Sequence, residues 1–137
     1  MSKYKDNERE KAPKRKCFNN DSFNGIYRKI PREFVLSNWK NNFLGEIPQK
    51  LILSYFEHNK ISWWGGKKPT GNILSSQIAC LNYLFVIRTD RDAVLSLAQT
   101  ISTDLIDVLE IANDSNNTKA FISFEVVSDT DYLNECD

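Results

Sequence analysis

Residues 72–88, with the sequence NILSSQIACLNYLFVIR, decide the fold because they predict a helix that is apolar on nearly every side. Either Ser75 or Asn72 is suited to cap the start of this helix. Three apolar residues share one helical face, and three more widen it: Ile78, Leu81 and Phe85, with Ala79, Cys80 and Leu84. We therefore expect this helix in the protein interior, with Cys80 as a packed, inert thiol.

The segments on either side predict a loop, a long helix and a strand. Upstream, residues 61–71 (ISWWGGKKPTG) combine adjacent tryptophans, glycines and a proline, which favours a loop. Downstream, Thr89 and Asp92 resemble a capping box, and apolar residues then recur at helical spacing until about Asn113. Last, residues 120–127 (AFISFEVV) are β-branched and aromatic, which predicts a strand.

The preceding part of the chain predicts a turn and two further helices. An Asn-Gly pair within residues 21–30 favours a turn or a short hairpin. Pro31 suits the first turn of a helix that we expect to end at Gly45. Pro48 opens a second, amphipathic helix that we expect to close near His58. Its apolar stripe is Leu51, Ile52, Tyr55 and Phe56.

The predicted fold class is α/β, mostly helical in this chain. Residues 1–16 are basic and hold almost no apolar side chains, so we expect a flexible arm over 1–20 followed by a single domain over 21–137. That domain comprises N-terminal helices, a buried Ser-Ser-Gln helix, a long amphipathic helix and one C-terminal strand. Because an unpaired strand does not stabilise itself, it must pair with the 21–30 segment, with a second copy in a homodimer, or with sequence after Asp137. We favour the last, and so an incomplete core.

The composition excludes several classes of protein. A chain of 137 residues with 41% hydrophobic and 26% charged residues is typical of one globular domain. No stretch approaches the roughly 18 apolar residues of a membrane span, and the N-terminus lacks the apolar centre of a signal peptide. We therefore expect a cytoplasmic protein with no membrane contact. Three cysteines and one histidine argue against a zinc site and a disulfide scaffold.

Charge is divided unevenly along the chain. Residues 1–89 contain 16 Lys and Arg against 7 Asp and Glu, whereas residues 90–137 contain 2 against 11. The first part attracts a polyanion such as DNA, and the second part repels one. The alternative is that the two parts screen one another in the folded chain.

Polar residues at the start of the 72–88 helix are candidates for a site. Gln77 is able to orient a water or a substrate phosphate, and Ser75 and Ser76 leave helix N–H groups where an anion can dock. The alternative is a helix cap with satisfied core amides, including Asn82.

The 61–71 loop holds a second candidate. Trp64 beside Lys67 and Lys68 suits a stacking surface with phosphate-binding cations, as in single-strand binders. The alternative is a loop that one tryptophan pins to the core. The loop is no P-loop, because Lys68 stands where that motif needs Ser or Thr.

Acidic residues do not predict a metal site in this chain. Four of them lie one helical turn apart: Asp104, Asp107, Glu110 and Asp114. We expect these four on a solvated helix face. Glu125 lies on the predicted strand, but the lysine that a metal-dependent phosphodiesterase would place two residues later is replaced by Val127.

The segment NILSSQIACLNYLFVIR, preceded by ISWWGGKKPTG and followed after one helix by FISFEVVSDTDYLNE, resembles bacterial restriction-endonuclease-like proteins of the PD-(D/E)XK nuclease superfamily. The likeness is to their N-terminal part and spans residues 60–135. There, a Ser-Ser-Gln helix with a later Asn opens the nuclease core: here Ser75, Ser76, Gln77 and Asn82. A strand ending in an acidic loop then precedes the catalytic Asp and Glu-x-Lys: here Leu133, Asn134 and Glu135.

The resemblance implies Mg²⁺-dependent DNA cleavage, with Gln77 and Glu125 as candidate catalytic residues. It also implies that the main metal-binding carboxylates and the lysine lie beyond Asp137, so that this chain holds no cofactor itself. The leading hypothesis is therefore the truncated N-terminal portion of a nuclease-like protein, DNA-associated and inactive alone. The alternative is a small helical module without catalytic activity that binds protein through the aromatic-rich residues 34–64.

Overall fold

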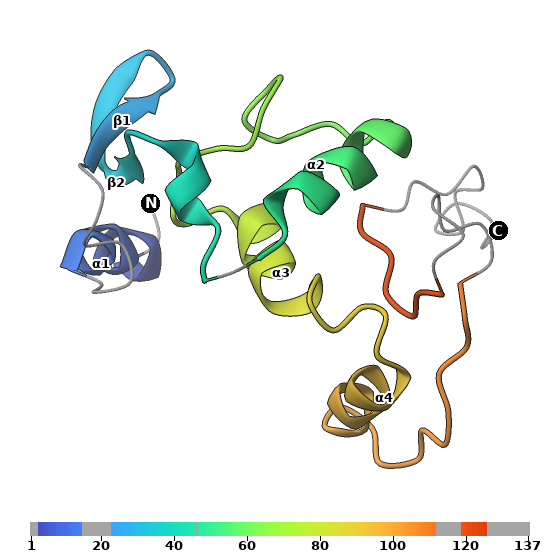
Figure 1. The fold of residues 1–137 in the computed structure, drawn as a ribbon. Coiled ribbons are helices and arrows are strands. Elements are labelled where there is room, and N and C mark those ends of the chain that lie inside the picture. Colours follow the sequence, from blue (N-terminus) through green and yellow to red (C-terminus); the bar gives the residue numbers. More distant parts are fainter. Residues whose placement is uncertain (1–2, 15–22, 46, 112–118, 126–137) are drawn as a thin grey trace, which may run out of the picture. The chain divides into compact units, whose positions relative to one another are not determined.

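The computed structural model describes residues 3–14, 23–45, 47–111 and 119–125. The fold is mixed α/β, with helices and a two-stranded antiparallel sheet (Figure 1). The chain divides into two compact units, Met1–Ile87 (unit 1) and Arg88–Asp137 (unit 2), which are described separately below. In the part of the chain that the structure describes, no helix has the length and apolar character that a membrane span requires.

The N-terminal segment of unit 1 is helical, although the sequence predicts a flexible arm there. Helix α1 (Lys3–Lys11) continues into a 3₁₀ turn, η1 (Ala12–Lys14), in which Ala12 is buried. Ion pairs along the helix include Arg9 with Asp6 at 3.5 Å. Such pairs at helical spacing support a helix that buries little apolar surface. A tertiary contact adds to them, since the Arg9 guanidinium lies 5.1 Å from the centroid of the Phe34 ring.

The next segment forms a hairpin, in part where a helix is predicted. Strands β1 (Phe23–Tyr27) and β2 (Ile30–Leu36) pair antiparallel across a two-residue turn. The turn residues Arg28 and Lys29 have φ values of 51° and 66°, the left-handed backbone that tight hairpins require. The hairpin prediction is thus confirmed, but its turn lies after the Asn-Gly pair, which instead coincides with an irregularity in the β1 register.

The predicted helix over 31–45 is wrong. The fixed φ of Pro31 suits an edge strand as well as a helix start, and here the strand pairing prevails. After β2, a short 3₁₀ helix, η3 (Trp39–Asn42), follows, and Asn38 caps it by accepting from the Lys40 N–H. Gly45 has the left-handed φ expected of it, 63°, but the helix just before it is the short 3₁₀ helix η3 and not an α-helix.

A short loop segment, residues 71–73, forms backbone hydrogen bonds with strand β2. The Leu36 N–H donates to the Gly71 carbonyl at 2.9 Å, and the Ile73 N–H donates to the Phe34 carbonyl at 3.2 Å. A Cβ on Gly71 would lie less than 3.0 Å from the Leu36 carbonyl oxygen, so this approach requires glycine. The loop that precedes α3 is therefore fixed to the sheet.

Helices α2 (Gln49–His58) and α3 (Ser76–Leu84) supply most of the unit 1 core, and both are predicted helices (Figure 1). Their buried apolar residues are Ile52, Tyr55 and Phe56 on α2, and Ile78 and Leu81 on α3 with Phe85 just beyond it. Two details of the prediction are wrong. Leu51 is 60% exposed, and Cys80 and Tyr83 are also exposed, so α3 is buried on one face only.

Buried amides connect the parts of this core. The Asn42 side chain, 2% exposed, donates to the carbonyls of Thr70 at 2.9 Å and Asn72 at 3.0 Å. Asn82 of α3 donates to the Asn42 carbonyl at 2.9 Å and accepts from the Leu44 N–H at 3.1 Å. Asn82 is thus a satisfied core amide, which is the alternative that the sequence left open.

Unit 2 begins with a helix shorter than predicted. Helix α4 (Arg91–Gln99) is capped by Asp90, whose side chain accepts from the Ala93 N–H at 3.0 Å. The predicted continuation to Asn113 is wrong, since residues 102–111 contain no helix. A side chain takes up a backbone acceptor that a continued helix would use: Gln99 Nε2 donates to the Leu105 carbonyl at 2.9 Å.

The predicted strand over 120–127 is wrong for its described part. Residues 120–125 form no strand, and residues 126 and 127 lie outside the described residues. The Phe121 N–H donates to the Arg88 carbonyl at 2.8 Å, while Ala120 and Phe124 are buried. Residue 125 has a φ of 50°, outside the range of strands. This segment is held by isolated backbone hydrogen bonds and by burial of side chains, and not by the repeated hydrogen bonds of a β-ladder.

Candidate nucleic-acid interface

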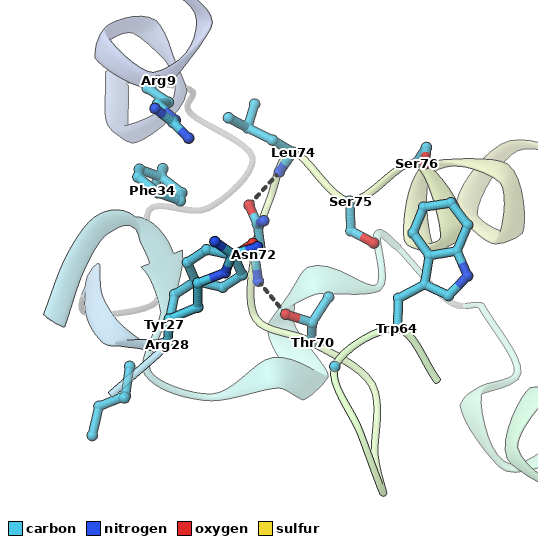
Figure 2. A pocket seen from close by; sticks show the side chains of 12 residues that line it. Arg9, Tyr27, Arg28, Phe34, Trp64, Thr70, Asn72, Leu74, Ser75 and Ser76 are labelled. Carbon is cyan, nitrogen blue, oxygen red and sulfur yellow. Dashed lines mark hydrogen bonds between the residues drawn. The ribbon is translucent and has the colours of Figure 1, made fainter. Parts of the chain in front are cut away.

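Unit 1 contains a cavity of about 590 Å³ between the hairpin, α1, the loop containing Trp64 and the start of α3 (Figure 2). Trp64, Ser75 and Ser76, three of the predicted nucleic-acid-binding residues, line it. The remaining lining comes largely from α1 and the hairpin, which the sequence did not connect with this site. The structure thus brings the predicted residues together with basic and aromatic residues from the N-terminal part.

Two arginines supply positive charge to this cavity. Arg28 lies in the hairpin turn, with its guanidinium 5.4 Å from the centroid of the Tyr27 ring. Arg9 comes from α1 and lies over Phe34. The guanidinium group is a planar fork of N–H donors that matches phosphate oxygens. No sequence motif marked either residue: Arg28 lies in the hairpin turn beside Tyr27, and Arg9 reaches the cavity through its tertiary contact with Phe34.

The adjacent tryptophans of the 61–71 loop have different roles. Trp63 stacks on Phe56 of α2, with ring centroids 3.8 Å apart and an interplanar angle of 11°. Trp64, in contrast, is 65% exposed and lines the cavity. One tryptophan therefore anchors the loop, and the other offers its indole face. The alternative of a loop pinned to the core is realised by Trp63, whereas Trp64 as a stacking surface stays a prediction.

Gln77 fixes the backbone beside Trp64. Its side chain is buried, donating from Nε2 to the Ser62 carbonyl at 3.2 Å and accepting at Oε1 from the Trp64 N–H at 3.1 Å. It does not belong to the cavity lining. The structure places this predicted catalytic residue under the loop, where it positions Trp64.

The first turn of α3 and the loop before it form one wall of the cavity. Ser75 caps the helix, since its Oγ accepts from the Ile78 N–H at 3.4 Å. Asn72 holds the approach to the helix: its Oδ1 accepts from the Leu74 N–H at 3.0 Å, and its own N–H donates to Thr70 Oγ1 at 3.1 Å (Figure 2). This wall is therefore rigid, and the positive end of a helix dipole lies beside it.

Lys67 and Lys68 are exposed and lie outside the lining of the cavity. They follow the tight turn in which the Gly66 N–H donates to the Trp63 carbonyl at 2.9 Å. Their position on the same loop as Trp64 leaves them available to a larger ligand that covers the loop.

The remaining acidic candidates belong to unit 2. Glu125 is exposed there, whereas Gln77 belongs to unit 1. Asp107 forms an ion pair with Arg91, and Glu110 pairs with Lys119 at 3.6 Å. Within the described ranges, no three His, Cys, Asp or Glu side chains cluster as a metal ion needs. The described residues therefore do not fit a Mg²⁺ site.

Comparison with protein families matches residues 2–136 with the family described as restriction endonuclease associating with ARP. The chain belongs to this family. Its membership agrees with the predicted restriction-endonuclease-like character, and the match covers more of the chain than the 60–135 resemblance does. No curated protein and no solved structure matches the chain.

Proposed function

We propose that this chain is the DNA-contacting part of a restriction-endonuclease-like protein, and that unit 1 makes the contact. The observation that carries the proposal is the cavity of unit 1, where Arg9 and Arg28 meet Trp64 and the start of α3. Cations bind the phosphate backbone and exposed aromatic rings stack on bases, so the two together suit a nucleic acid. Membership of the restriction endonuclease family supports the choice of DNA.

The charges of the units support the same assignment. Unit 1 contains 15 Lys and Arg against 7 Asp and Glu, and unit 2 contains 3 against 11. DNA is attracted to unit 1 and repelled by unit 2, which orients the chain on its substrate. The interface then includes Lys67 and Lys68, which extend the basic surface beyond the cavity.

Cleavage is a separate part of the proposal. We assign the chain to the PD-(D/E)XK superfamily, in which bound Mg²⁺ activates a water for attack on the phosphodiester. Because the described residues assemble no carboxylate cluster, we propose that they bind DNA without cutting it. The family description names an association with ARP, and we propose the same association for this chain. We also propose that the chain acts in the cytoplasm.

The alternative of a protein-binding module is not favoured. It relies on the aromatic-rich residues 34–64, but Phe43, Tyr55 and Phe56 of that segment are buried in the core of unit 1. Their apolar surface is therefore covered by the chain itself.

DNA affinity should depend steeply on salt. If about four phosphates are neutralised, the association constant of a fluorescent duplex falls about 100-fold between 50 and 200 mM salt. Fluorescence anisotropy measures this, and Mg²⁺ in the same titration should leave the duplex intact.

The double variant Lys67→Ala and Lys68→Ala should flatten the slope of log affinity against log salt by up to about two. Lys119→Ala in acidic unit 2 serves as the control and should leave the slope unchanged.

Two results contradict this proposal. One is no DNA binding at 50 mM salt, and the other is binding whose affinity does not respond to salt. Mg²⁺-dependent cutting by the chain would overturn the separate claim that it binds without cleaving.

A further inference from the structure

We infer that the cavity of unit 1 accepts a single nucleotide that has left its base stack, with its phosphate at Arg9 and Arg28 and its base against Trp64. This inference rests on the proposed function and names the part of DNA that enters the cavity. Three features of the cavity carry it: its size, its charge and the fixed presentation of Trp64.

The size selects one nucleotide over a duplex. A volume of about 590 Å³ lies within the range of small-molecule sites. It is too small for double-stranded DNA, one helical turn of which is about 34 Å long. A nucleotide of DNA therefore reaches the cavity only from a single strand, from a chain end, or by rotation out of a duplex.

The charge selects an anion over a cation or an apolar ligand. Arg9 and Arg28 line the cavity, and the described lining carries no carboxylate; Asp6, which pairs with Arg9 at 3.5 Å, is not part of that lining. Both guanidinium groups lie near aromatic rings, at 5.1 Å and 5.4 Å from the centroids, within the range of cation–π attraction. Guanidinium groups recognise phosphate in two-point contacts.

The remaining walls suit a base. The indole of Trp64 is exposed, and the backbone of its loop is held by the hydrogen bond from the Trp64 N–H to Gln77 and by the stacking of Trp63 on Phe56. Because the loop backbone is already ordered, stacking of a base on the indole has a smaller entropic cost. Stacking of this kind contributes about 1 to 3 kcal/mol per base.

Binding of mononucleotides by the full chain tests this inference. The probes are deoxynucleoside 5′-monophosphates, the matching nucleosides without phosphate, and inorganic phosphate, each titrated by calorimetry. We expect the monophosphates to bind at least tenfold more tightly than either fragment. Trp64→Ala and Arg28→Ala should each weaken that binding at least tenfold. Tyr83→Ala and Lys50→Ala, an exposed aromatic and an exposed cation outside the cavity lining, are the matched controls and should leave it within twofold.

The outcomes separate this inference from the proposed function. Salt-dependent DNA binding without mononucleotide binding overturns the nucleotide cavity and leaves the proposed function standing. Equal affinity for phosphate and for the monophosphates also overturns it, because the base then contributes nothing. Mononucleotide binding lost in Trp64→Ala, in a chain that fails to bind DNA, supports the cavity and contradicts the proposed function.

Discussion

Asn42→Asp is expected to lower the free energy of unfolding of unit 1 by about 3 to 5 kcal/mol, the cost of an uncompensated buried charge. The Asn42 amide donates both of its N–H groups to backbone carbonyls, those of Thr70 and Asn72. The aspartate keeps the shape of the side chain but presents oxygen to both carbonyls, and only 2% of the residue is exposed to water. The loss should appear as a lower urea midpoint at neutral pH.

The matched control for this variant is Asn7→Asp on the exposed surface of α1. It makes the same chemical change where water solvates the carboxylate, so we expect a change within about 0.5 kcal/mol. Equal urea midpoints for Asn42→Asp and the unaltered chain would contradict the hydrogen-bonded connection between η3 and the loop before α3.

Phe56→Ala is expected to cost a similar amount, about 3 to 5 kcal/mol, because it removes a buried aromatic ring and leaves a cavity. Phe56 is 1% exposed, stacks on Trp63 and makes an edge contact with Tyr55 at 6.2 Å between centroids. Its loss also removes the anchor of the loop that presents Trp64. Chemical denaturation measures the first effect, and the near-ultraviolet circular dichroism of the tryptophans measures the second.

Leu51→Ala on the same helix is the control, since Leu51 is 60% exposed. We expect it to change stability by less than about 1 kcal/mol and to leave the tryptophan signal unaltered. If Phe56→Ala and Leu51→Ala lower the free energy of unfolding by the same amount, the core of unit 1 is not built around Phe56.

Helices α2 and α3 and the loop between them were predictable because each has a local signal. Pro48 opens α2, Ser75 caps α3, and the glycines mark the loop. Where two local signals compete, the prediction failed. Pro31 fits a helix start and an edge strand equally, and only its pairing with Ile26 decides between them.

The predictions for the C-terminal helix and strand failed for a related reason, because hydrogen bonds that the local pattern does not reveal decide the structure there. Helical spacing of apolar residues continues past Gln99, but the side chain of Gln99 bonds to the Leu105 carbonyl, and periodicity does not register such a bond. The alternating side chains of residues 120–125 are likewise compatible with a strand. In the structure, however, the Phe121 N–H donates to the Arg88 carbonyl, which belongs to no strand. A strand also needs a partner, which no local pattern supplies.

The site was predictable in the part that is local in sequence. Trp64, Ser75 and Ser76 were identified because aromatic residues, glycines and serines precede a helix. Arg9 and Arg28 could not be identified, because Arg9 is placed by a tertiary contact with Phe34 and Arg28 by a hairpin turn whose position the sequence did not reveal. Gln77 is predicted as a catalytic residue, and the structure shows that its hydrogen bonds go to the loop backbone.

Photo-crosslinking of iodouracil-substituted DNA to the chain tests the central claim most directly. Iodouracil couples to aromatic side chains on which it stacks, and mass spectrometry of the digested adduct locates the residue. We expect adducts on Trp64 or Tyr27, both in the cavity lining of unit 1, at low salt and with single-stranded DNA above all. Adducts confined to residues 88–137, or an absence of adducts under conditions where the chain binds DNA, would contradict it.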